Sequence, residues 1–206
     1  MAPLLGEPLP VELMNTLWAD RDGVHDALAE PAGAVAWLRA IGPRAEIPAD
    51  GFGAPGDHTE AEAVARQLRQ LRDALRRLAA EVTGDPRPTA GPASRSAAID
   101  TINRAAAIAP SWPELNWPDG GPAIRQVRSR GPAARALLSA VAAQAAVLFA
   151  GPDQPRLRAC LAPGCVLYFV QNHPRREWCS AGCGNRARVA RHYRRHRPAA
   201  PQGDQA

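Results

Sequence analysis

Four cysteines fall within 24 residues toward the end of this 206-residue chain, and they are its only cysteines. Four residues separate Cys160 from Cys165, three separate Cys179 from Cys183, and thirteen lie between the two pairs. A tetrahedral Zn²⁺ site fits this pattern, because each pair supplies two thiolates from one turn and the connector folds back to join the pairs. We therefore predict one structural zinc ion bound by Cys160, Cys165, Cys179 and Cys183, with no position left open for catalysis.

The sequence is also compatible with other roles for the four thiols. Two disulfides are disfavoured in a reducing cytosol, and four unrelated buried thiols are disfavoured by the clustering. His173, His192 and His196 lie close enough in sequence to replace a cysteine ligand. Thiolates that release zinc on oxidation would make the site a redox sensor.

The residues around the cysteines predict a small finger. Pro163-Gly164 favours a turn, 167–170 a strand, 172–174 a second turn and 175–178 a returning strand. From Ser180 onward the pattern is helical. A knuckle, a β-hairpin and a helix in this order form a treble-clef-like zinc finger.

The net charge of +5 is distributed unevenly. Residues 1–153 carry 15 arginines against 18 acidic residues, whereas residues 154–206 carry 10 against 2. Four thiolates around one zinc ion reduce the formal +8 of the second part to about +6. A basic segment beside a neutral-to-acidic body indicates an anionic partner, with duplex DNA the first candidate.

The predicted helix after Cys183 concentrates this charge. On a helical wheel Cys183, Ala187 and Ala190 face the zinc site, and arginines occupy much of the remaining surface. Gly184 and Asn185 are expected to be structural, the first through close approach to the sulfurs and the second through a bond to the hairpin backbone. The alternatives to DNA binding are a solvated helix without a specific partner and a module that binds RNA or protein. The predicted DNA contacts are Arg175, Arg176, Arg186, Arg188, Arg191, Arg194 and Arg195.

Residues 1–153 predict a mainly helical body. Apolar periodicity favours helices over 10–18, 31–41, 59–82, the region of Ile99 to Ile108, and 132–150, with a loop over 43–58. The arginine-rich face of helix 59–82 is expected to be solvated. Trp112 and Trp117 are interpreted as core anchors or as part of a short hairpin that covers the body. No signal peptide is recognised, and residues 133–150 are too interrupted for a membrane span, so we expect a cytoplasmic protein without a membrane partner.

The body offers few candidates for chemistry. Asn15 and Thr16 sit in an apolar helix and Asn103 sits among isoleucines, so these polar groups would either line a pocket for a small-molecule effector or satisfy neighbouring backbone. No catalytic set of Ser, His, Cys or paired carboxylates can be assembled, so no enzyme activity is expected. The body is predicted to sense a ligand or to form a homodimer.

The sequence Trp178-Cys-Ser-Ala-Gly-Cys-Gly-Asn-Arg186, with the helix after it and with Cys160 and Cys165 before it, resembles the CGNR zinc finger. Upstream, Leu13 to Thr16, Pro31 to Leu38, helix 61–82 and Ile102-Asn103 resemble the ABATE-type domain that accompanies this finger in bacterial stress-induced transcription regulators. The resemblance implies DNA binding by the finger and regulation by the body. It divides the chain into a helical domain over 1–153, the finger over 154–198, and a disordered tail over 199–206.

Overall fold

The longest helix, α3 (His58–Thr83), lies at the centre of a helical body. In the computed structural model, which describes residues 3–47, 58–88 and 90–196, it packs against four other helices: α1 (Leu9–Met14), α2 (Pro31–Ile41), α4 (Arg95–Ala106) and α5 (Ala133–Ala150). Leu68, Leu71 and Leu75 of α3 are fully buried, in agreement with their spacing of three and four residues. The predicted mainly helical fold is confirmed.

Helix boundaries follow local signals where these are strong. α2 begins at Pro31, whose fixed φ suits a first helical turn, and it ends just before Gly42. α4 begins after Ser94, whose side chain accepts a 3.1 Å hydrogen bond from the Ala97 N–H. The predicted loop over 43–58 begins inside a short 3-10 helix (Gly42–Ala45), and its residues 48–57 lie outside the described part of the chain.

The first predicted helix is shorter than expected. It ends at Met14, and the chain continues into the antiparallel hairpin β1 (Leu17–Asp20) and β2 (Gly23–Asp26), with Leu17 paired to Asp26. The Thr16 hydroxyl donates a 2.8 Å hydrogen bond to the Leu13 carbonyl, and the Asn15 side chain bonds elsewhere. Short polar side chains of this kind compete with helical hydrogen bonding, which accounts for the early end.

Helix α5 is apolar because it belongs to the core. Its length and composition alone would allow it to cross a membrane, although the polar residues that interrupt it predicted otherwise. No other helix among the described residues meets this criterion. However, α5 packs on α1, α3 and α4. Leu137, Leu138 and Val141 are buried there. Burial within the body therefore explains its composition.

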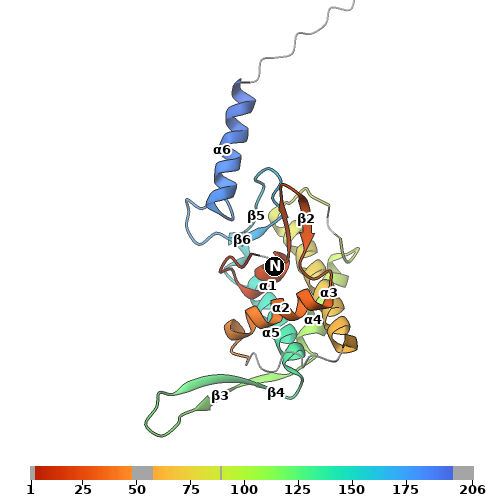
Figure 1. The fold of residues 1–206 in the computed structure, drawn as a ribbon, viewed down its shortest axis with the longest axis vertical. Coiled ribbons are helices and arrows are strands. Elements are labelled where there is room, and N and C mark those ends of the chain that lie inside the picture. Colours follow the sequence, from red (N-terminus) through yellow and green to blue (C-terminus); the bar gives the residue numbers. More distant parts are fainter. Residues whose placement is uncertain (1–2, 48–57, 89, 197–206) are drawn as a thin grey trace, which may run out of the picture.

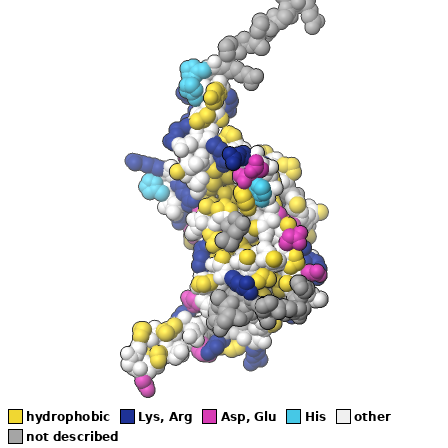
Figure 2. Space-filling model, in the orientation of Figure 1, with side chains coloured by type: hydrophobic (Ala, Val, Ile, Leu, Met, Phe, Trp, Pro, Cys, Tyr) yellow, Lys and Arg dark blue, Asp and Glu magenta, His cyan; other side chains and the backbone are white. Residues whose placement is uncertain are grey.

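A two-stranded arm projects from the body at the end opposite α6 (Ala181–His196) (Figure 1). It consists of β3 (Ser111–Asn116) and β4 (Ile124–Ser129), paired in register from Ser111 opposite Ser129 to Asn116 opposite Ile124. The hairpin was expected, but it does not cover the body. Trp112 and Trp117 are 43% and 71% exposed, so they are not core anchors. Figure 2 shows hydrophobic side chains along this arm.

The finger pairs its strands differently from the prediction. After a 3-10 turn (Gln154–Arg156), β5 (Leu157–Ala159) pairs antiparallel with β6 (Tyr168–Val170), and residues 175–178 form no strand. The turn between β5 and β6 is the first cysteine knuckle, which folds the chain back on itself. Strand β6 therefore pairs with the segment before the knuckle and not with residues 175–178. The predicted tail over 199–206 lies outside the described residues.

Strand β6 joins two hydrophobic cores. Tyr168 and Val170 are buried in the core of the helical body, and Phe169 between them is buried in a second cluster that contains the four cysteines. Successive side chains of a strand point to opposite faces, so this alternation fixes the finger against the body.

Candidate metal centre and nucleic-acid interface

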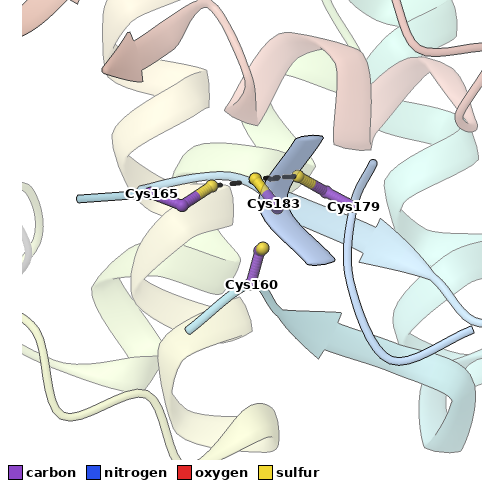
Figure 3. Close-up of side chains that lie close together, drawn as sticks. All are labelled: Cys160, Cys165, Cys179 and Cys183. Atoms are coloured by element: carbon purple, nitrogen blue, oxygen red, sulfur yellow. Dashed lines mark hydrogen bonds between the residues drawn. The ribbon is translucent and has the colours of Figure 1, made fainter. Parts of the chain in front are cut away.

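The four cysteine sulfurs converge on one point (Figure 3). Cys160 follows β5, Cys165 lies beyond the knuckle turn, Cys179 precedes α6, and Cys183 lies in its first turn. All four are buried, and their sulfurs lie within 4.8 Å of one another. The Sγ atoms of Cys165 and Cys179 are 3.8 Å apart, and those of Cys179 and Cys183 are 3.4 Å apart.

These distances fit a zinc ion. A tetrahedral centre with Zn–S bonds of about 2.3 Å separates its sulfurs by about 3.8 Å, whereas a disulfide requires about 2.05 Å. The cysteines are free thiols, which excludes the two-disulfide alternative in this arrangement. Four thiolates complete the coordination of one zinc ion, which is the pattern of a structural site.

Local geometry shapes both cysteine pairs. In the knuckle, Gly164 adopts φ +71°, and the Cys165 N–H donates a 2.9 Å hydrogen bond to the Ala162 carbonyl. At the start of α6, the Cys183 N–H donates to the Ser180 hydroxyl at 3.3 Å. The guanidinium of Arg186 donates a 3.0 Å hydrogen bond to the Cys183 sulfur, and this contact raises the pKa of Arg186.

Gly184 and Asn185 have other roles than those predicted. A Cβ on Gly184 would lie 3.2 Å from the Trp178 ring, so this glycine permits contact with the indole rather than with the sulfurs. The Asn185 side chain accepts a hydrogen bond from Arg188 and does not bond the hairpin backbone.

Three arginines bind the backbone around the metal centre. Arg87 donates to the carbonyls of Cys165 at 2.5 Å and Cys160 at 3.2 Å, and Arg76 donates to the Val166 carbonyl at 3.1 Å. Arg176 donates to the Cys179 carbonyl at 3.0 Å. Arg76 and Arg87 belong to the body, so the body itself supports the knuckle that presents two ligands.

A cluster of polar residues locks the finger to the body. Asp85 accepts hydrogen bonds from Tyr168 Oη at 2.6 Å and from Arg87 Nη2 at 2.6 Å. Burial opposes its ionisation, but these hydrogen bonds outweigh that effect and lower the pKa of Asp85. Burial raises the pKa of Tyr168, which therefore stays a neutral donor.

Glu7 and Asn15 complete this lock. Glu7 accepts from the Val170 N–H at 2.9 Å and from Arg176 at 2.6 Å. The Asn15 amide donates to the Tyr168 carbonyl at 2.9 Å and accepts from its N–H at 2.8 Å. Sequence reasoning missed Glu7, Arg76, Asp85 and Arg87, because nothing in their local pattern distinguishes them from surface charges.

The structure separates the three residues predicted to bind a ligand. Asn15 and Thr16 are fully buried and hydrogen-bonded to backbone, which is the alternative role considered for them. Neither lines a described cavity. Asn103 is exposed on α4 and lines a groove.

Of the predicted DNA contacts, most are available and one is occupied. Arg176 lies 4.8 Å above the Phe169 ring and bonds Glu7 and the Cys179 carbonyl, so its guanidinium holds the fold together. Arg186 is exposed but lies against Cys183. The remaining side chains are exposed on α6 or on the loop before it: Arg175, Arg188, Arg191, Arg194 and Arg195.

Two family models match the chain. The ABATE model, described as "Putative stress-induced transcription regulator", covers residues 7–152, and the CGNR zinc finger model covers residues 156–196. No curated protein matches the chain. The two descriptions name a regulator and a zinc finger, neither of which is an enzyme class.

Proposed function

Because the chain belongs to the ABATE family and ends in a CGNR zinc finger, we propose that it is a cytoplasmic regulator of transcription, linked to stress, that binds duplex DNA through α6. Zinc fixes the start of this helix, and the rest projects away from the body (Figure 1). Its 16 residues span about 24 Å, long enough to lie along a major groove about 12 Å wide.

The observation that carries the proposal is the unpaired charge on α6. Arg188, Arg191 and Arg195 recur at intervals of three and four, so they share one face of the helix. All three are exposed, and none forms an ion pair within the described residues. Helix α6 contains no acidic residue. Guanidinium groups arranged in this way suit phosphates and guanine edges.

The test measures binding of the zinc-loaded full chain to a fluorescein-labelled duplex of mixed sequence by anisotropy. Affinity should fall steeply between about 50 and 200 mM salt, because phosphate contacts release counterions. The double variant R188A/R191A should bind more weakly, and the slope of log K against log salt should decrease by about 2.

The matched control is R66A/R135A, which removes the same charge from exposed positions on the body. Equal losses in the two double variants would show a net-charge effect and contradict the assignment to α6. A hairpin RNA that displaces the duplex at much lower concentration would make RNA the preferred partner instead.

We further infer that the body dimerises through the β3–β4 arm. Leu115 and Trp117 are 70% and 71% exposed. A lone two-stranded ribbon is marginally stable in water, so a second copy that packs on the arm would cover its exposed apolar side chains.

Light scattering during size-exclusion chromatography tests the dimer. Wild type should elute with twice the chain mass, and L115E/W117E should elute as a monomer because charges cannot be buried in an apolar contact. V24E, at an exposed apolar position on β2, should remain dimeric. A monomeric wild type, or a dimeric arm variant, would refute the arm as the interface.

A further inference from the structure

A groove of about 480 Å³ lies among α3, α4 and α5, away from the metal centre. Its walls are apolar and come from all three helices: Leu78, Val82, Ile99, Ile102, Ala145 and Phe149. Val82 and Ile99 remain 42% and 41% exposed, so the helices leave apolar surface uncovered here. Small-molecule sites have this size range and this character.

Two amide side chains provide the polar part of the groove. Asn103 of α4 and Gln154, just beyond α5, both line it. Neither side chain has a hydrogen-bond partner within the described residues. An amide both donates and accepts, so the pair can recognise an amide, a hydroxyl or a carbonyl.

The charges at the groove are already paired. The two charged residues that line the groove, Glu81 and Arg95, form an ion pair with each other, so neither sign is in excess along its walls. A charged ligand would lose hydration without gaining a counter-charge, which disfavours its binding. The surroundings therefore suit a neutral ligand.

We propose that this groove binds a small neutral molecule, apolar over most of its surface, whose one polar group contacts Asn103 and Gln154. The inference rests on the proposed function in that such a ligand is the effector of the regulator. Gln154 opens the 3-10 turn that leads directly into β5 and the zinc knuckle. A ligand that contacts Ala150 and Gln154 thus contacts the segment that enters the finger.

The test uses N-phenyl-1-naphthylamine, a neutral apolar probe with one N–H, whose fluorescence rises on transfer out of water. Titration of the zinc-loaded full chain should give saturable binding. A146W places a large ring in the groove from an exposed helical position and should raise the dissociation constant by about tenfold or more. N103A should raise it several-fold.

The matched control is A143W, at an exposed position one turn earlier on α5 and outside the groove. It should bind the probe within about twofold of wild type. No saturable binding by wild type, or equal binding by A146W and A143W, would overturn the site. Tighter binding by L115E/W117E than by wild type would overturn it as well, since the groove would then hold the partner's arm.

The same variants are measured with duplex DNA. A146W should retain the wild-type affinity for DNA without ligand, whereas R188A/R191A should bind the probe normally. A groove that does not bind the probe and an α6 that does not bind DNA therefore give different results.

Discussion

At the scale of single residues, the carboxylate of Asp85 joins the body to the finger. Its side chain is 1% exposed and accepts hydrogen bonds from Arg87 and Tyr168. Removal of a buried charge partner usually costs more than the net value of the pair, because the remaining groups stay buried without a partner. Asp85 therefore stabilises the fold by accepting hydrogen bonds from Arg87 and Tyr168, which would otherwise lose a partner.

We expect D85N to lower the free energy of unfolding by about 2–3 kcal/mol at neutral pH. The pKa of Asp85 in the folded chain is below its ordinary value of 3.8, so its contribution is fully present above that value. The contribution is lost as the pH falls through the lower, folded pKa. Urea unfolding followed by tryptophan fluorescence should show the difference between wild type and D85N shrinking below about pH 4.

D119N, in the exposed turn of the arm, is the control and should change stability little at any pH. A difference between D85N and wild type that stays constant with pH would contradict the ionised hydrogen-bonded role of Asp85.

At the scale of secondary-structure elements, helix α3 shows why a polar face is not always a solvated face. Its arginine-rich side was expected in water, yet Arg72 and Arg76 are only 4% and 9% exposed. Arg72 pairs with Asp26 at 2.5 Å, and Arg76 bonds the Met14 and Val166 carbonyls. Burial lowers the pKa of Arg76, so its charge is retained at a cost in solvation.

We expect R76A to destabilise the chain by about 3 kcal/mol and to speed zinc release, since it leaves the Val166 carbonyl beside Cys165 without its donors. R66A, exposed on the same helix, is the control and should be neutral. Thermal unfolding and a chromophoric zinc chelator measure the two effects. Zinc release at the same rate in R76A, R66A and wild type would show that α3 does not support the knuckle.

At the scale of the whole molecule, the finger and the body each contribute side chains to the other's hydrophobic core. Leu157, Tyr168 and Val170 of the finger strands are buried with the helices, whereas Leu5 and Trp18 of the body pack on the cysteine cluster. The strands that enclose the metal thus also complete the body. Structural zinc contributes on the order of 10 kcal/mol to small folds, and this energy is expected to reach the body through β6.

Removal of zinc by a strong chelator should therefore lower the melting temperature of the helical body, read from far-ultraviolet circular dichroism, and added zinc should restore it. The control is D85N in the zinc-bound form, which should melt between the zinc-bound and zinc-free wild type because it loosens the junction alone. A body that melts at the same temperature with and without zinc would show that the two parts are independent.

The sequence by itself determined what depends on spacing and local chemistry: four zinc ligands, the helix begun by Pro31, and arginines in register on α6. Tertiary structure alone decided which strand pairs with β6, that Arg76 and Arg176 bind carbonyls rather than solvent or DNA, and that Asn15 holds Tyr168 from 153 residues away. The reason is physical. A helix or a metal knuckle is fixed by neighbours a few residues apart, whereas burial of a polar side chain depends on partners that only the folded chain brings to it.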